Sequence, residues 1–534
     1  MRRGAFPHTW PVARLGSRSL VVAAAIVLIA ASGQAAGPDR AAAATRTDVK
    51  ILVNTPATFD PAATGDAGTA AIVAQLYETL TTYDASLTLE PALAASWDVA
   101  PDGMRVTFHL RPNLEFSDGS PLTAADVVGS WLRIIDPKAP SPLADLMVDV
   151  KGARAYLAGT STDPSSVGLS ASGSDVVVDL ERPGADFPAI VSSPTFGIVP
   201  SINWKQASSD FGLNAVTSGG YTMSAGTNQE ITLDRNEHYW AGAPAIHTAH
   251  LILDINGQNP VTAFTKGDLD DTEVSVTDAP WIPYDKDIGP SLRSIPGLTL
   301  TYLGLDTTTK PFNDVRVRQA FAAAIDWHRI LPLGAFTGET MAVSMVPPGI
   351  PGGGTQDWLP KYDPDHARQL LAAAGYPNGK GLPVIHFAVG GSPIGDAIAN
   401  DLEQQLGMTV ERETFDDTLT RIATDPPNAW LTGWVADYVG PNDFLGVLLA
   451  SDSSNNYGHW KSSEFDAAIS SALGTRDPAA AQAAYEQALA IVRDQVPTIP
   501  LYNETTYALS RNGLLGAYDN GLGILRVAGM AWAR

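Results

Sequence analysis

The chain of 534 residues carries 34 basic and 57 acidic side chains, a formal net charge of −23, and 45% of its residues are hydrophobic. A surface with this excess of negative charge repels phosphate backbones, which excludes nucleic acid as an expected partner. The chain has no cysteine, so disulfides and cysteine-bound zinc are excluded as well. At roughly 150 residues per domain the length predicts about three domains, and the hydrophobic content is sufficient for large cores.

The N-terminus has the pattern of a secretory signal peptide. Arg2, Arg3 and further arginines precede an apolar run at residues 20–31, which is shorter than the roughly 20 residues that span a bilayer. We expect residues 1–44 to be removed and the protein to be exported; the alternative is a short anchor that stays attached. Ser32 stands where a bacterial lipoprotein would carry its lipidated cysteine, so lipid attachment at this position is excluded.

The following segments alternate between short strands and helices. Residues 50–53 predict a buried strand, and apolar residues at helical spacing predict a helix over residues 69–80. Residues 105–110 alternate between apolar and polar side chains, which is typical of a half-buried strand. Thr123 is a predicted N-cap of the next helix.

The second half of the chain predicts several helices with clear start signals. Asp314, Asp363 and Asp477 each precede an amphipathic stretch, and the last two are followed directly by proline. These caps and apolar stripes are structural features that indicate a mixed α/β architecture. They point to no particular chemistry.

A set of motifs resembles the extracellular solute-binding proteins of the peptide/nickel family. The most specific match is the pair of segments at residues 107–111 and 116–127, similar to the family signature F-x-L-R followed by F-x-DG-x-P-x-TA-x-DV. Further matches occur in family order, at residues 75–80, 89–97, 218–221, 233–240, 263–270, 312–326, 362–377 and 433–438.

This resemblance implies a periplasmic-binding-protein-like α/β fold with two lobes, two crossover strands, an extra α/β domain and a ligand enclosed between the lobes. The implied parts of the chain are lobe one at residues 48–84, 195–302 and 505–534, the extra domain at residues 85–194, and lobe two at residues 303–504.

The resemblance further implies a non-enzymatic function. The exported protein is expected to capture a short peptide by lobe closure and deliver it to the permease of an ABC importer, as a monomer and without a cofactor. One alternative keeps the fold and changes the ligand to a metal chelate, an oligosaccharide, an opine or haem. A third reading is a secreted hydrolase or a surface interaction protein.

Asp437 is the first candidate for ligand binding. In peptide-binding members the aspartate of the GW-x-ADY motif pairs with the α-ammonium of the ligand, and a buried cation requires such a counter-charge. The resemblance also implies that backbone groups of Gly433 and Val435 pair with the peptide main chain, which is a sequence-independent mode of recognition. The loop that follows, residues 438–445, is smaller and less acidic than in peptide-binding members.

Other candidates depend on weaker signals. Asn455 and Asn456 lie in a polar loop that resembles a ligand-side loop of the family, although ordinary loop chemistry explains them equally well. Trp434 packs either on a ligand or, as we favour, in the core of the lobe. Tyr502 and residues 64–68 are further candidates. The cation that would bind the carboxylate of a peptide is not identified by the sequence.

The motifs of common hydrolases are absent from the sequence. There is no His-Glu-x-x-His zinc motif. Residues 390–395 resemble a nucleophile elbow but miss its spacing by one residue. His247 and His250 flank a predicted strand and are expected on opposite faces, so they predict no metal site.

Overall fold

The structure is a computed structural model, and it describes residues 46–205, 211–333, 339–353, 356–389, 391–415, 417–517 and 520–533. The predicted signal peptide and its cleavage site lie outside the described residues. Within this range, none of the helices combines the length and the apolar character needed to cross a membrane.

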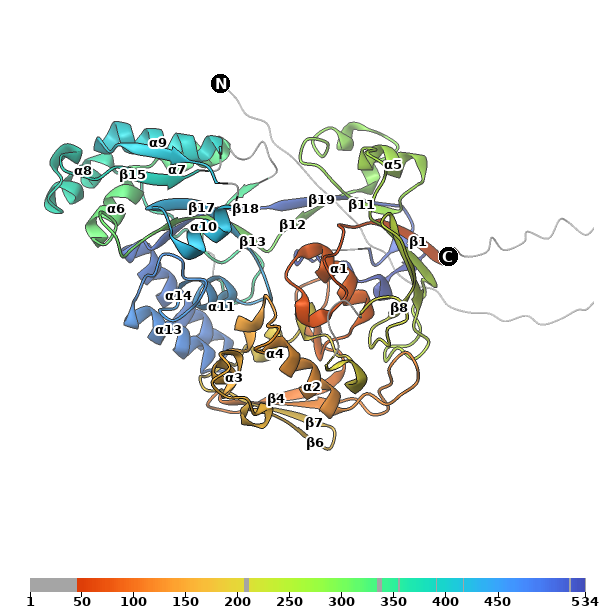
Figure 1. The fold of residues 1–534 in the computed structure, drawn as a ribbon. Helices are drawn as coiled ribbons and strands as arrows, with labels where there is room; N and C mark the ends of the chain where they lie inside the picture. The colour runs from red at the N-terminus through yellow and green to blue at the C-terminus, as the bar shows by residue number, and fades with distance from the viewer. Residues whose placement is uncertain are drawn as a thin grey trace, which may run out of the picture. The chain divides into compact units, whose positions relative to one another are not determined.

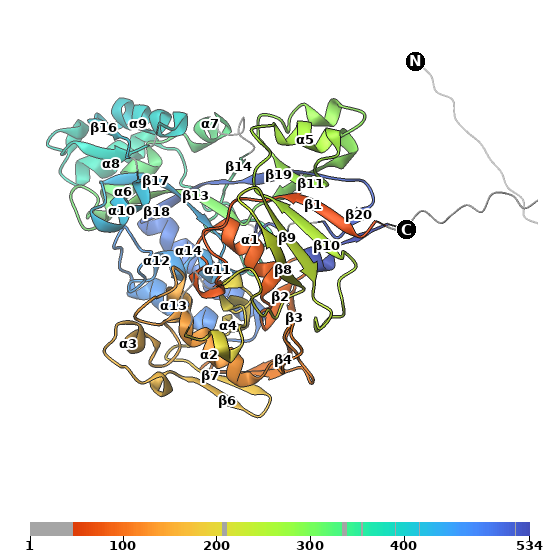
Figure 2. The same ribbon diagram turned by 45° about the vertical axis from the view of Figure 1, so that its right-hand side comes forward.

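The first large sheet has seven strands and is built from residues before 300 together with one strand near the C-terminus (Figures 1 and 2). Helix α1 (Ala67–Leu76) packs beside its β8 end, over a core that includes Ile72, Val73 and Leu233. The strands, in sheet order, are β12 (Leu292–Pro296), β19 (Thr505–Ser510), β11 (Asp271–Val274), β1 (Asp48–Leu52), β10 (Thr248–Ile252), β9 (Glu230–Arg235) and β8 (Tyr221–Gly226).

The second large sheet has six strands and belongs to the C-terminal half of the chain. Its buried core contains side chains from strands and helices, including Leu303, Phe321 and Phe387. The strands, in sheet order, are β14 (Thr340–Met341), β18 (Thr498–Asn503), β13 (Thr299–Leu305), β17 (Ala429–Val435), β15 (Ile385–Ala388) and β16 (Val410–Glu413).

Two chain segments connect the two large sheets. One runs from β12 into β13 and the other from β18 into β19, and the two segments pair with each other in both sheets. At the transition the Gly297 N–H donates to the Glu504 carbonyl oxygen at 2.9 Å. In Figure 1, β18 and β19 follow one line from one sheet to the other. The predicted boundary between lobe one and lobe two, at residues 302 and 303, falls inside β13. All of β13 belongs to the six-stranded sheet.

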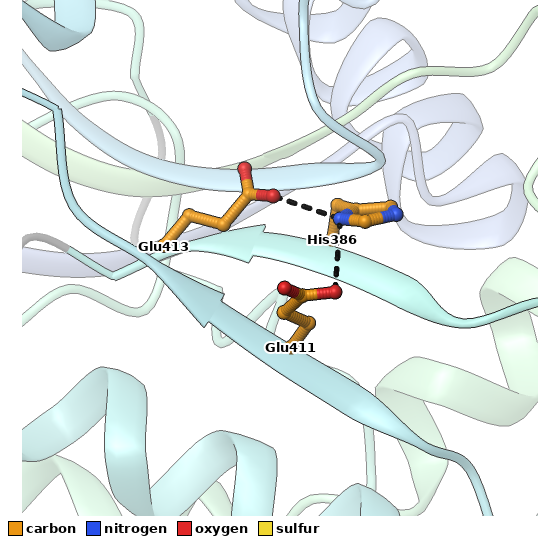
Figure 3. A group of neighbouring side chains, drawn as sticks. All are labelled: His386, Glu411 and Glu413. Carbon is orange, nitrogen blue, oxygen red and sulfur yellow. Dashed lines mark hydrogen bonds and ion pairs between the residues drawn. The ribbon is translucent and has the colours of Figure 1, made fainter.

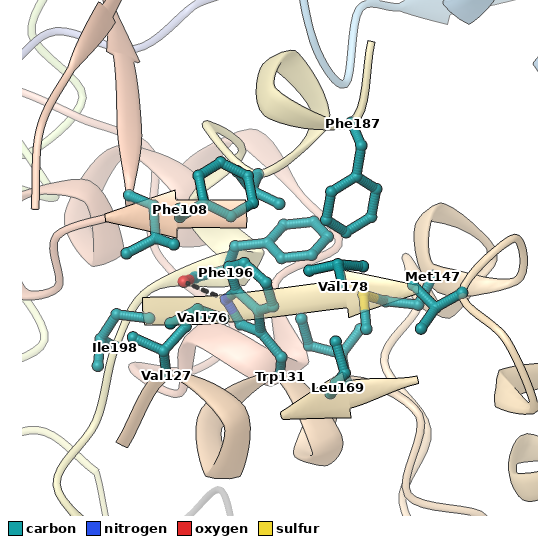
Figure 4. Close-up of a cluster of buried hydrophobic side chains, with 14 of the residues drawn as sticks. Phe108, Val127, Trp131, Met147, Leu169, Val176, Val178, Phe187, Phe196 and Ile198 are labelled. Carbon is teal, nitrogen blue, oxygen red and sulfur yellow. Dashed lines mark hydrogen bonds between the residues drawn. The ribbon is translucent and has the colours of Figure 1, made fainter. Parts of the chain in front are cut away.

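A separate four-stranded sheet is formed by residues 94–179. Its strands, in sheet order, are β4 (Ala94–Val99), β5 (Arg105–Leu110), β7 (Asp175–Asp179) and β6 (Leu169–Ser172). Helix α2 (Ala124–Ile134) covers this sheet and places Trp131 against three phenylalanine rings at 5.6 to 6.1 Å (Figure 4). The Trp131 indole N–H donates to the Phe196 carbonyl oxygen at 3.3 Å, so the polar atom of this buried side chain has a partner.

The predicted start of helix α2 is confirmed. The helix begins directly after Thr123, whose N–H and hydroxyl both donate to the Asp126 carboxylate. The three predicted aspartate caps are confirmed in the same way, since each side chain accepts a backbone N–H of the following helix.

The predicted helix over residues 69–80 was wrong at its C-terminal end. Helix α1 ends at Leu76, and the next residues are extended. The reason is tertiary: Glu78 is buried, pairs with the Arg526 guanidinium at 2.9 Å and accepts the Tyr239 hydroxyl at 2.5 Å. A helical continuation would remove Glu78 from these partners, and an unpaired buried charge is costly.

The remaining helices and strands surround these sheets. The helices are α3 (Ala153–Leu157), α4 (Phe187–Ile190), α5 (Pro260–Lys266), α6 (Val315–Ala323), α7 (Trp327–Ile330), α8 (Pro364–Ala373), α9 (Pro393–Leu406), α10 (Thr418–Thr424), α11 (Pro441–Phe444), α12 (Gly446–Leu449), α13 (Ser463–Leu473) and α14 (Pro478–Gln495); the short strands are β2 (Thr81–Tyr83), β3 (Leu89–Pro91), β20 (Leu514–Leu515) and β21 (Ala531–Trp532).

Replacing Trp131 with alanine is expected to lower the free energy of unfolding by about 3–5 kcal/mol, because it removes a fully buried aromatic side chain and leaves a cavity. Urea unfolding followed by far-UV circular dichroism measures the change. The control is Tyr284→Ala, since Tyr284 is 90% exposed and its loss should change stability by less than about 0.5 kcal/mol. Equal effects of the two substitutions would contradict the packing of Trp131.

Candidate functional site

A cavity of about 850 Å³ lies between the C-terminal half of the chain and the part that carries the four-stranded sheet. One wall is formed by the end of β17 and by helices α12 and α13 with the loop between them. The other is formed by residues 142–149, Arg154 and residues 180–190. From the segment 64–68 only Gly65 lines the cavity. The resemblance implied a ligand between the two lobes; the walls of this cavity come chiefly from lobe two and the extra domain.

Asp437 is the second residue after the C-terminal end of β17 and lines the cavity. Its backbone N–H donates to Asp443 Oδ2 at 3.0 Å, but within the described part of the chain its own carboxylate has neither a hydrogen-bond donor nor an ion-pair partner. Burial raises the pKa of the Asp437 carboxyl to about 7, from an ordinary value of 3.8. A half-buried carboxylate without a partner is a site that a cationic group would stabilise.

Asp443 lies behind Asp437 and is fully buried. Its Oδ2 accepts the Asp437 N–H and, at 3.4 Å, the indole N–H of Trp434, while its Oδ1 has no partner among the described residues. Burial, and then the nearby charge of Asp437, raise the pKa of Asp443 well above its ordinary value. Ionisation of one of these two carboxyl groups therefore opposes ionisation of the other, and the doubly ionised pair is unfavourable without a nearby cation.

Asp186 joins the two walls of the cavity. It belongs to the segment that follows the four-stranded sheet, and its carboxylate accepts the Tyr438 hydroxyl at 2.8 Å and the Asn442 amide at 3.3 Å. Burial raises the pKa of Asp186 to about 6. The Tyr438 ring is correspondingly buried in the core of the four-stranded sheet, although it follows β17 in the chain.

The backbone of Gly433 and Val435 faces the cavity along a free edge of β17. The Ala436 N–H donates to the Leu298 carbonyl oxygen at 2.9 Å, and hydrogen-bonded pairs alternate along an antiparallel ladder. The register pairs Val435 with Thr299 and Gly433 with Thr301, so these two pairs are the non-hydrogen-bonded ones. The backbone N–H and C=O groups of Gly433 and Val435 therefore point away from β13.

No other strand occupies that edge in the part of the chain that the structure describes. Strand β15 pairs with β17 only at Ala429 and Trp430. Both Gly433 and Val435 are exposed and line the cavity, and Val435 is 59% exposed. The edge can therefore accept an added strand.

The other predicted site residues divide into two groups. Trp434 and Asn455 line the cavity. Asn456 does not line the cavity. Its side-chain amide N–H groups donate to three carbonyl oxygens, and its side-chain oxygen accepts the Trp460 N–H, so Asn456 stabilises the conformation of the loop. Tyr502 is buried in the core of the six-stranded sheet, and its hydroxyl donates to the Leu331 carbonyl oxygen at 3.0 Å.

The sequence did not reveal the residues that the extra domain contributes. Asp186, Arg154 and Arg182 line the cavity from that side. Asp186 and Tyr438 are 252 positions apart, and no local pattern marks such a contact. The acidic side chains of the lining are Asp145, Asp149, Asp186, Asp437, Asp452 and Asp466, against two arginines.

A second cluster of interest lies away from the cavity, on β15 and β16. His386 Nδ1 is 2.8 Å from Glu413 and 3.6 Å from Glu411 (Figure 3). Within the described ranges these three side chains form the one group of potential metal ligands whose atoms lie within 4.8 Å of one another. His386 and Glu411 are exposed, Glu413 is partly buried, and His386 Nδ1 already shares a hydrogen bond with Glu413, so we assign no metal to this group.

Comparison with known proteins places the chain in a family. Residues 88–456 match the family described as bacterial extracellular solute-binding proteins, family 5. The chain belongs to this family. Its members are solute-binding proteins of ABC importers rather than enzymes, which confirms the non-catalytic function predicted from the motifs.

The similar curated proteins bind different ligands. A probable deoxycholate-binding periplasmic protein of Escherichia coli, YgiS, is 31% identical, over 84% of this chain and 86% of its own length. The periplasmic oligopeptide-binding protein OppA of Salmonella typhimurium is 28% identical, over 92% of this chain and 94% of its own. Heme-binding protein A of Haemophilus influenzae is also 28% identical, with the same two coverages.

Solved structures confirm the two-lobed fold. The unliganded open form of the murein tripeptide-binding protein MppA matches with a TM-score of 0.76 at 24% identity, over 91% of this chain and 97% of the other. Haemophilus influenzae OppA in complex with the peptide RPPGFSPFR matches with a TM-score of 0.71 at 23% identity, over 92% and 99%.

The paired carboxyls predict a pH dependence of stability. Burial raises both pKa values, so between pH 3.8 and about 7 the folded protein binds more protons than the unfolded chain, and stability falls as the pH rises through this window. Asp443→Asn removes one of the two charges. The thermal midpoint of this variant should fall less between pH 5 and pH 8 than that of the unaltered protein; identical pH profiles would contradict the coupling.

Proposed function

We propose that this chain captures short peptides outside the cytoplasm and delivers them to the permease of an ABC importer. The observation that carries the proposal is the Asp437 carboxylate, which lines the cavity without a partner. The α-ammonium of a peptide supplies the missing cation, and a charge-assisted hydrogen bond inside a cavity is strong.

The free edge of β17 supports a peptide over other amines. Gly433 and Val435 offer their backbone groups beside Asp437, and an extended peptide can pair with them through its main chain. Such pairing holds the ligand without reading its side chains. Export through the N-terminal segment and lobe closure around the ligand complete the proposed cycle.

The charge of the cavity bears on the alternative ligands. Deoxycholate and haem, named for two similar proteins, both carry carboxylates, and six acidic side chains against two arginines disfavour such anions. Their apolar ring systems would nevertheless suit the apolar lining residues, among them Leu143, Ile190 and Val447. A non-peptide solute is therefore the second candidate.

Replacing Asp437 with asparagine is expected to weaken the binding of a short peptide by about 3–5 kcal/mol, because the buried ammonium loses its counter-charge. Isothermal titration calorimetry measures this loss. N-acetylation of the peptide should weaken binding to the unaltered protein and make little further difference to the variant. The matched control is Asp425→Asn, an aspartate of the same half that is 84% exposed. Unchanged affinity in Asp437→Asn would refute the role of Asp437.

Native mass spectrometry of the purified protein, before and after denaturation, tests the ligand class directly. We expect a heterogeneous set of bound masses, each of a few amino-acid residues, that is released on unfolding, because backbone pairing tolerates many sequences. One discrete non-peptide mass would instead establish the second candidate.

A further inference from the structure

A second cavity, of about 690 Å³, lies in the C-terminal half of the chain and shares none of its lining residues with the cavity at Asp437. Its ionisable residues are Arg318, His459 and Lys461, and no carboxylate of the described residues lines it. The chain as a whole has 57 acidic and 34 basic residues, so the charge of this lining is opposite to the net charge. A cavity lined by one sign of charge attracts ions of the other sign.

Arg318 is a buried cation without a counter-ion. The residue is 5% exposed, and its Nε donates to the Gln495 carbonyl oxygen at 2.8 Å and its Nη1 to the Phe312 carbonyl oxygen at 2.7 Å. Its Nη2 makes no hydrogen bond within the described part of the chain, and the nearby Asp314 carboxylate pairs with Arg316 instead, at 2.6 Å. Burial lowers the pKa of Arg318 to about 10, although the charge of Asp314 opposes this shift. An anion in the cavity would stabilise the uncompensated charge.

The loop that carries the other two ionisable residues is fixed against the end of β13. The Gly458 carbonyl oxygen accepts both the N–H and the hydroxyl of Thr307 at 2.9 Å. A Cβ on Gly458 would lie 2.4 Å from the Leu305 carbonyl oxygen, so this close approach requires glycine. The next residue, His459, is held at φ 52°, a conformation that is costly for a residue with a side chain. The loop therefore presents His459 and Lys461 from a defined backbone position.

Three further side chains of the lining have polar groups without partners. The Lys461 ammonium and the His459 imidazole are exposed and make neither a hydrogen bond nor an ion pair with any described residue. Gln495 Oε1 accepts the Trp460 indole N–H at 3.1 Å, which fixes the amide group, and Gln495 Nε2 donates to none of the described residues. Together with Arg318, these groups reach the cavity from α6, from the loop before α13 and from the end of α14.

We propose that this cavity binds a phosphate-class oxyanion, either free or as the phosphoryl group of a small phosphorylated molecule. A planar carboxylate is bound best by two parallel N–H groups of one guanidinium, but Arg318 has only Nη2 unengaged. A tetrahedral oxyanion has oxygens in several directions, so it suits single donors that come from three elements. A phosphoryl group carries a charge of about −1.5 to −2 near neutral pH, which matches the two cations Arg318 and Lys461. This anion site does not depend on which solute binds at Asp437.

Isothermal titration calorimetry with inorganic phosphate, near neutral pH and at constant ionic strength, tests the site. The unaltered protein should bind phosphate saturably. Lys461→Gln should weaken binding about threefold or more, because it removes one charge of the lining. Arg318→Lys should weaken it about tenfold or more, because an ammonium cannot keep the two carbonyl contacts and also reach the anion. The control is Lys380→Gln, an exposed lysine that does not line the cavity and should leave the affinity unchanged.

The absence of saturable phosphate binding would overturn the proposed site. Phosphate binding that Lys461→Gln leaves unchanged would overturn it too, since the anion then binds elsewhere on the chain. Far-UV circular dichroism checks the fold of Arg318→Lys; if this variant does not fold, the comparison of Lys461→Gln with Lys380→Gln decides the question.

A parallel titration with glycerol phosphate distinguishes the two forms of the ligand. Tighter binding than that of inorganic phosphate, again weakened by Lys461→Gln, supports the site and identifies a phosphorylated molecule as its ligand. Equal or weaker binding, with the same effect of Lys461→Gln on inorganic phosphate, supports the site and identifies the free anion.

Discussion

Strand β13 pairs with β17 along its whole length, and the geometry of the site depends on this antiparallel ladder. The ladder alternates, so it directs the polar groups of every second β17 residue toward β13 and those of the others toward the free edge. It also places Asp437 two residues after the last paired residue, Val435. Because β13 continues from β12 of the other large sheet, the same ladder links the site to the connection between the lobes.

The electrostatics of the site follow from packing. Asp443 is enclosed behind Asp437 with one oxygen lacking a partner, and Asp186 is enclosed between the two walls. Burying carboxyl groups together opposes their ionisation, which raises their pKa values. In the complex proposed above, the ammonium of the ligand stabilises the ionised form of Asp437 and offsets this cost.

The extra domain contributes more than a support for the lobes. It supplies Asp186, Arg154 and Arg182 to the cavity, and its core accepts the Tyr438 ring from the opposite wall. The domain is held by its own aromatic cluster around Trp131, whose rings pack edge to face. This buried core includes neighbours of these charged side chains in the chain, among them Ala153 and Phe187.

The sequence by itself determined the family, the fold class and the local elements whose signals are short in range. Thr123, Asp314, Asp363 and Asp477 begin helices because each cap is an interaction between residues two or three apart. The motif around Asp437 marked one wall of the cavity, and the resemblance implied that Gly433 and Val435 offer their backbone groups to a ligand.

Tertiary structure decided the rest, including the pairing register of β17 with β13. Helix α1 stops at Leu76 because Glu78 has distant partners, and Tyr502 turns into the core rather than the cavity. Asp186 and Arg154 reach the site only because the extra domain packs on the second half of the chain, and no spacing of residues encodes a contact made across 252 positions.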